Sequence, residues 1–336
     1  AFLRNFLYNV PRMIKGLLVT VAELPLGAKG LGLGPIEFIA DAIFVLKYRY
    51  RLGMLIRELE IRKVRESALS ITKVPFTIAD NEGLKILVPP RIERIQVATR
   101  DKLYFTCRML ADHLGSINRG EVVYIAYPLD ARIPHVMIPV LDLVLTNNLK
   151  LLFVSFKYSA EEAKNIFFNL YSKLPTLTPK DTIDLLDKYF FLESLNPVGL
   201  DMIEITSHIK SLLGRGGAIG ILGLHGIEGL EETQEPREYW AMLTNMLYYL
   251  KSQGLITIIQ GSITSKTSYN KYASLADIVA KIEYRFEEGD ATPYLYIWRR
   301  GFKPVVNRLE EYFKHPCLTD LHTLALEKLG RVEESE

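Results

Sequence analysis

The amino-acid sequence predicts an α/β protein built on a mostly parallel sheet with helices on both faces. Strand-like and helical segments alternate from residue 121 to residue 286, and such alternation produces parallel strands joined by helical crossovers. Several of the predicted strands have no polar face, which is typical of strands buried on both sides. We expect two tandem units of this kind, of which the first is only partly present.

Composition supports two folded domains and excludes some partners. A chain of 336 residues with 49% hydrophobic residues is long and apolar enough for two buried cores. The formal net charge of +2 gives no reason to expect strong sequence-independent binding of nucleic acid. No apolar run reaches the roughly 18 residues needed to cross a bilayer, so we expect no membrane partner.

Cysteine and histidine usage argues against metal chemistry. The chain has two cysteines, Cys107 and Cys317, and six scattered histidines. So few cysteines in a chain of this length are typical of a reducing compartment, so we predict a cytoplasmic protein without a disulfide framework. Because there is no Cys-x-x-Cys motif and no Cys/His cluster, we expect no metal site.

Periodicity assigns elements to a first domain at residues 1–92, where the proline pair Pro89-Pro90 closes the last strand. The predicted elements are a helix at 3–16, a buried strand at 16–24, a glycine-rich loop at 27–34, strand-like runs at 38–50 and 55–64 around a turn at 51–53, and a meander completed by 75–88.

The second domain is predicted at residues 93–316, followed by a charged tail at 317–336. We expect strands at 121–127, 150–156, 189–194, 218–224, 255–261, 275–286 and 294–300. Helices are expected between them at 135–147, 159–174, 200–213 and 236–254.

A domain-sized repeat relates the two units. In each copy a helix leads into a strand that begins with glycine, and an Ala-Asp pair follows in the next strand, at Ala40-Asp41 and at Ala276-Asp277. The chain therefore resembles the back half of one unit followed by a whole second unit. Because the strand predicted at 16–24 needs partners, we expect residues that precede Ala1, or another chain, to supply them.

Several segments resemble the KaiC-like branch of the RecA superfamily of P-loop ATPases, an archaeal type with tandem domains. In the second unit the resemblance lies in residues 114–126, 151–166 and 275–286, and in the first unit it lies in 38–66 and 76–87. This resemblance implies a RecA-like fold for both units and a cytoplasmic, oligomeric protein.

The chain departs from this family where the P-loop belongs. A P-loop uses glycines so that backbone N–H groups can wrap phosphate, a lysine for charge, and a Ser or Thr for magnesium. In place of the family's Gly-Pro-Pro-Gly-Thr-Gly-Lys-Thr, residues 127–134 read Tyr-Pro-Leu-Asp-Ala-Arg-Ile-Pro. The altered positions are Tyr127, Pro128, Asp130, Arg132, Ile133 and Pro134.

Two further parts of the phosphoryl-transfer machinery are also missing. Lys157 and Tyr158 stand where the family has paired glutamates, and Gly223 stands near the place of the Walker B acid. The resemblance thus implies a pseudo-ATPase domain with no cofactor, no metal and no catalytic residue. His225 follows at a strand end where active sites lie in such sheets, and a structural histidine is the alternative.

A basic motif of the family is retained in part. Lys63 and Arg65 match the Lys-x-Arg with which family members reach a neighbouring subunit's phosphates, and Arg300 matches its arginine in the second unit. The resemblance implies an inter-subunit contact for these residues. Ordinary solvated charge on an exposed hairpin is the alternative reading.

Three functions remain open at this point. The first is a non-catalytic scaffold or regulatory partner-binding protein, which we expect as a dimer or hetero-complex in place of an ATP-dependent hexamer. The second is an ATPase whose P-loop lies upstream of Ala1, with a regulatory second domain. The third is a nucleic-acid- or ribosome-associated factor, which basic residues at 299, 300, 303 and 308 suggest.

Overall fold

The computed structural model separates the chain into two compact units, residues 1–88 and 89–336. This boundary lies close to residue 92, where the sequence predicts it. The structure describes residues 2–23, 35–51, 53–69, 71–79, 83–95, 97–99, 101–131, 137–172, 177–215, 219–287, 290–313 and 317–331.

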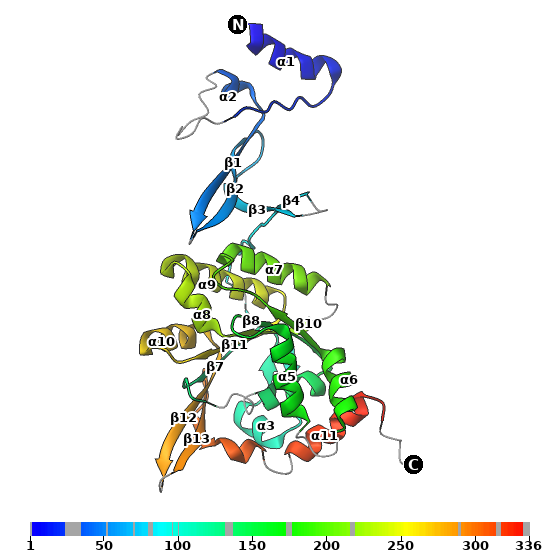
Figure 1. Ribbon diagram of the computed structural model, residues 1–336, viewed down its shortest axis with the longest axis vertical. Coiled ribbons are helices and arrows are strands. Elements are labelled where there is room, and N and C mark those ends of the chain that lie inside the picture. Colours follow the sequence, from blue (N-terminus) through cyan, green and yellow to red (C-terminus); the bar gives the residue numbers. More distant parts are fainter. Residues whose placement is uncertain are drawn as a thin grey trace. The chain divides into compact units, whose positions relative to one another are not determined.

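The smaller unit contains two helices and a four-stranded antiparallel sheet (Figure 1). Its strands follow one another in the sheet in chain order, so the predicted meander is confirmed. A small core of Leu59, Val74 and Phe76 lies on one face of the sheet. The elements are α1 (Phe2–Ile14), α2 (Pro35–Ile39), β1 (Ala42–Arg51), β2 (Met54–Val64), β3 (Lys73–Ala79) and β4 (Gly83–Ile86).

The strand predicted at 16–24 is wrong for the residues that the structure describes. Residues 17–23 form neither helix nor strand, and Leu17, Val19 and Val21 are 87%, 72% and 94% exposed. A strand needs a neighbour for its N–H and C=O groups, and the described part of this unit places no strand beside the segment. The glycine-rich loop at 27–34 lies outside the described residues.

The larger unit is built on an eight-stranded sheet in the order β14-β13-β12-β7-β11-β10-β8-β9. From β12 to β9 all neighbouring strands are parallel, and β13 and β14 add an antiparallel edge. The predicted mostly parallel sheet is therefore confirmed. The strands are β7 (Val122–Tyr127), β8 (Lys150–Ser155), β9 (Phe190–Ser194), β10 (Ile219–His225), β11 (Ile256–Ser262), β12 (Ile278–Glu287), β13 (Asp290–Arg299) and β14 (Val305–Arg308), with a separate pair of β5 (Lys102–Leu103) and β6 (Ile117–Asn118).

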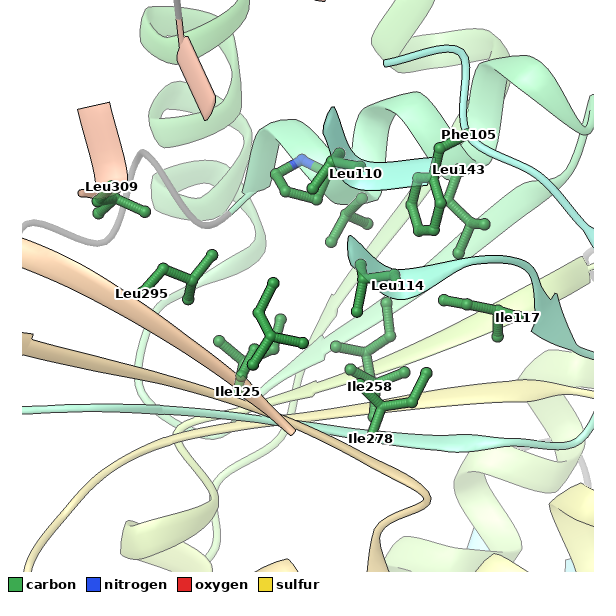
Figure 2. A pocket seen from close by; sticks show the side chains of 15 residues that line it. Phe105, Leu110, Leu114, Ile117, Ile125, Leu143, Ile258, Ile278, Leu295 and Leu309 are labelled. Carbon is green, nitrogen blue, oxygen red and sulfur yellow. The ribbon is translucent and has the colours of Figure 1, made fainter. Parts of the chain in front are cut away.

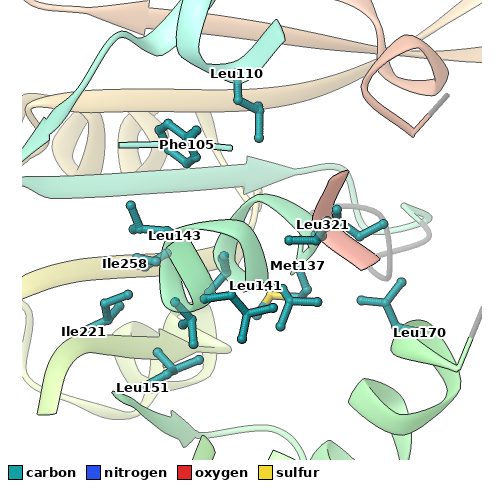
Figure 3. Close-up of a cluster of buried hydrophobic side chains, with 14 of the residues drawn as sticks. Phe105, Leu110, Met137, Leu141, Leu143, Leu151, Leu170, Ile221, Ile258 and Leu321 are labelled. Carbon is teal, nitrogen blue, oxygen red and sulfur yellow. The ribbon is translucent and has the colours of Figure 1, made fainter. Parts of the chain in front are cut away.

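Helices cover both faces of this sheet (Figure 1). One face packs against α3 (Arg108–Leu114), α4 (Ile138–Thr146), α5 (Ala160–Tyr171), α6 (Pro179–Tyr189) and α11 (Cys317–Lys328), and the other against α7 (Met202–Arg215), α8 (Ile227–Thr233), α9 (Pro236–Ser252) and α10 (Lys266–Leu275). Successive side chains of a strand point to opposite faces, so Ile125 packs on the α4 side and Tyr124 on the α9 side. The core on the α4 side is drawn in Figure 3.

The C-terminal segment is a folded part of the larger unit. The sequence predicts a charged tail from residue 317, but α11 buries Leu321 and Ala325 to 2% and 0% exposure. Figure 3 shows Leu321 beside Met137 and Leu141 at the α4 side of the core. The prediction of a charged tail is wrong. It was based on the charged residues of this segment, but apolar residues between them recur at helical spacing and form a face that packs on the core.

A disulfide joins the start of α3 to the start of α11. Cys107 and Cys317 are bonded, with their Cα atoms 4.7 Å apart and a sequence separation of 210. The prediction of no disulfide is therefore wrong, because cysteine count alone does not show that two distant helices meet on one face. Buried Asp142 of α4 accepts hydrogen bonds at 2.9 Å from the backbone N–H groups of Thr106 and Cys107, which fixes the same corner.

The repeat seen in the sequence has a structural counterpart within each unit. Strands β1, β2 and β3 form an antiparallel meander, and β12, β13 and β14 form another. The Asp41 carbonyl accepts a backbone hydrogen bond from Arg65 in the first, as the Asp277 carbonyl does from Arg300 in the second. The aligned Ala-Asp pairs therefore mark the same point of two similar hairpins.

We expect reduction of the disulfide to destabilise the larger unit. Cross-linking two positions so far apart in sequence restricts the unfolded chain and contributes about 2–4 kcal/mol. Urea unfolding with and without reductant measures this loss. A variant with both Cys107→Ser and Cys317→Ser is the control, and its stability should not respond to reductant. Alkylation of both thiols in the denatured, unreduced protein would contradict the bond.

An apolar cavity of about 60 Å³ lies between the sheet and α3 (Figure 2). In the figure Ile125, Ile258 and Ile278 line it from the sheet, and Leu110 and Leu114 line it from α3. An apolar void of this kind lacks partners for water and forfeits dispersion contacts. It is therefore a place where added volume improves packing.

Val123→Ile should fill part of this cavity, because Val123 lines it from β7. We expect the free energy of unfolding to rise by about 0.5–1 kcal/mol in urea titrations. The matched control is Val122→Ile, whose side chain packs into the core on the opposite face, where extra volume costs about 1–3 kcal/mol. Equal effects of the two substitutions would show that the cavity cannot accept a methylene group.

Candidate functional site

Polar side chains lie in a row at the carboxyl ends of the central parallel strands, where ligands bind in sheets of this type. Strands β8, β10 and β11 carry Ser155, His225 and Gln260 at the same register level, with His225 paired to both neighbours. Tyr127 ends β7, the next strand along, and faces the α4 side. The sheet thus brings four polar side chains to one edge from segments far apart in sequence.

His225 is a neutral, buried group in this row. Its side chain is 2% exposed and is stacked between the rings of Phe153 and Tyr158, at centroid distances of 5.5 and 5.2 Å. Burial, together with the positive charge of Lys157, lowers the pKa of His225 to about 4. The imidazole therefore carries no charge at neutral pH.

The hydrogen bonds of Ser155 define the tautomer of His225. The Ser155 hydroxyl oxygen accepts from the backbone N–H groups of Lys157 and Tyr158, at 3.2 and 2.8 Å. Both lone pairs are then used, so the hydroxyl hydrogen donates to His225 Nδ1 at 3.2 Å. Nδ1 is consequently unprotonated, and the ring proton lies on Nε2.

Gln260 has an unsatisfied amide. Its side chain is 2% exposed, and its Nε2 donates to the weak acceptor Met137 Sδ, at 3.2 Å. The Oε1 atom has no hydrogen-bond partner among the described residues. A buried carbonyl oxygen without a donor is unusual in a folded protein and marks a place where a donor is missing.

A cavity of about 220 Å³ opens beside these groups. His225 and Gln260 line it together with rings and aliphatic side chains from β8, α5 and the residue preceding α4. Aromatic and apolar side chains with a few convergent polar groups are typical of small-molecule sites. This cavity is therefore the candidate functional site of the larger unit.

Lys157 and Glu228 form an ion pair at the rim of the same edge. Lys157 Nζ lies 3.8 Å from Glu228 Oε1, and the two side chains are 44% and 14% exposed. Glu228 Oε2 also accepts the backbone N–H of Ser262 at 3.2 Å. Lys157 therefore has an acidic partner from α8 at this edge.

The backbone at the end of β10 requires glycine. Gly226 has a φ of +75° and begins α8. A β-carbon there would lie 2.9 Å from Lys157 Cβ, so a larger residue would displace the lysine that pairs with Glu228. Gly223, by contrast, lies inside β10 between Phe153 and Ile258. The strand end on the α4 side is occupied by His225, two residues beyond Gly223.

The structure brings several of the residues singled out from the sequence to this one edge. Tyr127 is 1% exposed at the end of β7, and burial raises the pKa of its hydroxyl above the usual value. Pro128 and exposed Asp130 follow in a turn, and Tyr158 covers His225. The remaining three altered positions, Arg132, Ile133 and Pro134, lie outside the described residues.

Lys63 and Arg65 have partners within the smaller unit. Lys63 Nζ donates to the carbonyls of Glu37 and Phe38 at 3.0 Å, and Arg65 donates to the Phe38 carbonyl at 2.7 Å. Arg65 also pairs with Asp41 at 3.2 Å. These cations hold the C-terminal end of α2, where positive charge is favourable. An additional contact with a neighbouring subunit stays a prediction.

Arg299, one of the basic residues that suggested nucleic-acid binding, serves the fold instead. Its guanidinium donates to both carboxylate oxygens of Glu121, at 2.9 and 3.1 Å, and to the Leu114 carbonyl at 2.7 Å. The side chains of this pair are 11% and 10% exposed. Arg299 is therefore not available for phosphate, whereas its neighbour Arg300 is exposed after β13.

Among the described residues no group of acidic, histidine or cysteine side chains is arranged to hold a metal ion. None of the helices in those residues has the length and apolarity of a bilayer span. Comparison with protein-family models found no matching family, and no curated protein matches the sequence.

We expect the stability of the larger unit to fall as the pH decreases from about 6.5 to about 4. The pKa of His225 is about 6.5 in the unfolded chain and is lowered to about 4 in the folded state. As the pH falls through this range the unfolded chain binds a proton that the folded protein excludes, so the free energy of unfolding decreases by up to about 3 kcal/mol. Urea titrations across this range measure the loss.

His225→Asn should flatten this part of the pH profile. The matched control is His208→Asn, at an exposed position on α7, which should leave the profile unchanged. An identical slope in the wild type and in His225→Asn would show that the carboxylates, and not His225, determine it.

Proposed function

We propose that the larger unit is a RecA-like domain of the KaiC-like type that has lost nucleotide binding and catalysis, and that the protein acts as a scaffold or regulatory partner-binding protein. One observation carries the proposal. The central strands carry Tyr127, Gln260, His225 and Ser155 at or near their carboxyl ends, and these are neutral groups where phosphoryl transfer needs a lysine and carboxylates.

The turn after β7 supports the loss of phosphate binding. A phosphate site at this place requires several N–H groups that converge on the anion. Pro128 has no N–H group, and Asp130 adds negative charge in the same turn. The Tyr127 ring is fully buried beneath the turn, so the strand end is filled by an aromatic side chain.

The charges at the neighbouring strand ends also oppose MgATP. A lysine, Lys157, follows β8 where the family has carboxylates that orient water. The nearest acid after β10, Glu228, is held by Lys157 and by the Ser262 N–H group. A carboxylate with these partners would have to give them up in order to orient magnesium.

Partner binding is supported by exposed apolar side chains in the smaller unit. Phe44, Leu46, Tyr48 and Tyr50 alternate along one face of β1 and are 57%, 58%, 59% and 71% exposed. A contiguous apolar strip of this kind marks protein interaction surfaces. Since the larger unit lacks an ATP-dependent contact in this proposal, the assembly is a dimer or a hetero-complex.

The two alternative functions, an ATPase and a nucleic-acid-associated factor, predict different binding sites. An ATPase that uses a P-loop upstream of Ala1 would bind nucleotide outside the larger unit. A nucleic-acid-associated factor would need a free basic surface, and the internal role of Arg299 removes one residue from that surface. A salt-dependent mobility shift on mixed RNA or DNA distinguishes this alternative from a protein scaffold.

The proposal predicts that MgATP and MgADP leave the edge of the larger unit unprotected. We expect hydrogen exchange of residues 124–131 to be unchanged at sub-millimolar nucleotide, because Tyr127, Pro128 and Asp130 offer no phosphate cradle. The local readout separates this site from any nucleotide bound elsewhere in the protein. Clear protection of 124–131 would refute the loss of nucleotide binding.

A further inference from the structure

We infer that the cavity beside His225 and Gln260 is a binding site for a small, uncharged, planar aromatic molecule that carries one N–H or O–H donor. This inference goes beyond the scaffold proposal and does not depend on a RecA-like origin, because it rests on the cavity alone. Four properties of the cavity support it: the volume, the side chains that line the wall, one buried acceptor without a partner, and the absence of charge from the lining.

The size of the cavity fits a bicyclic ring. Its volume is about 220 Å³, whereas an apolar protein cavity of about 150 Å³ holds benzene. A second fused ring accounts for the difference. Ligands much larger than this, such as an intact nucleoside triphosphate, exceed the volume of the cavity.

The lining favours a flat, apolar ligand. Phe153, Tyr158 and Phe167 contribute rings to the wall, and Met137 contributes a polarisable thioether. Rings of this kind stack on, or meet edge-on, an aromatic guest, and sulfur adds a favourable contact with a ring edge. An aliphatic guest would gain the burial but not these oriented contacts.

The orphaned oxygen of Gln260 specifies a hydrogen-bond donor. Gln260 is 2% exposed, lines the cavity, and has no partner for Oε1 among the described residues. Leaving such a carbonyl unpaired is unfavourable for the empty protein. A ligand N–H or O–H that donates to this oxygen would remove the penalty, which gives the site its chemical preference.

The charge state of the lining excludes an ion as the preferred ligand. His225 is neutral in its buried position. The described residues that line the cavity include no lysine, arginine, aspartate or glutamate, and Lys157 and Glu228 at the same edge are paired with each other. A charged guest would lose its hydration without gaining an opposite charge in the wall.

The pair of probes that tests the inference is indole and benzofuran, which have nearly the same shape and differ in the donor. We expect indole to bind the full-length protein in calorimetric or ligand-observed NMR titrations, and benzofuran to bind about tenfold more weakly. Gln260→Met removes the acceptor at similar volume and should abolish the preference for indole. Ala163→Met, which extends a side chain of α5 into the cavity, should weaken both probes.

The outcomes are distinct. Folding of each variant is checked by far-UV circular dichroism and by urea unfolding. Failure of indole to bind the folded wild type, or an indole preference that survives Gln260→Met, would overturn the inference. Protection of residues 124–131 by MgATP would overturn the loss of nucleotide binding instead, and the indole and benzofuran titrations would still decide this inference separately.

Discussion

The structure of the larger unit depends on one constraint, which is that a parallel sheet must be covered on both faces. Strands β7, β8, β10 and β11 are buried throughout or almost throughout their length, so their backbone groups must be satisfied within the sheet and their side chains must be apolar. Polar chemistry is then confined to the strand ends. This is why Ser155, His225 and Gln260 form a row at one edge, and why two of them line a cavity there.

The same constraint explains which parts of the fold could be predicted. Continuous apolar runs predict buried strands well, and the strands of the larger unit lie within a few residues of their expected places. An apolar run, however, does not show that a neighbouring strand is present. Residues 17–23 are apolar and were predicted to be a strand, but the described residues place no strand beside them. Short or polar helices such as α6 and α10 were missed because their apolar stripes are narrow. The disulfide was missed because it requires the starts of α3 and α11 to lie together near Asp142. The spacing of the two cysteines in the sequence does not show this tertiary contact.

The site was predictable in position more than in detail. Tyr127, Lys157 and Tyr158, which were singled out from the sequence, lie at one edge, since parallel strands bring their carboxyl ends together. Gly223 lies two residues before the end of β10, and that end becomes clear only from the pairing with β8 and β11. Gln260 was not singled out. Its signal is present in the sequence as a long amide side chain directly after two isoleucines in a mostly apolar strand, and a buried amide of this kind needs a hydrogen-bond partner.

The buried amide of Gln260 distinguishes an inert scaffold from a ligand-binding site at this edge of the sheet. If the larger unit were only an inert scaffold, an apolar residue at position 260 would pack against Met137 without the penalty of an unpaired amide oxygen. Ser155 donates to His225 Nδ1, and Lys157 pairs with Glu228. The buried Tyr127 hydroxyl and Gln260 Oε1 have no partner among the described residues, and of the two it is Gln260 that lines the cavity, where its amide Nε2 donates to a sulfur atom. A site that has exchanged charged groups for neutral ones, yet keeps one buried acceptor open, is physically consistent with a ligand that brings the donor.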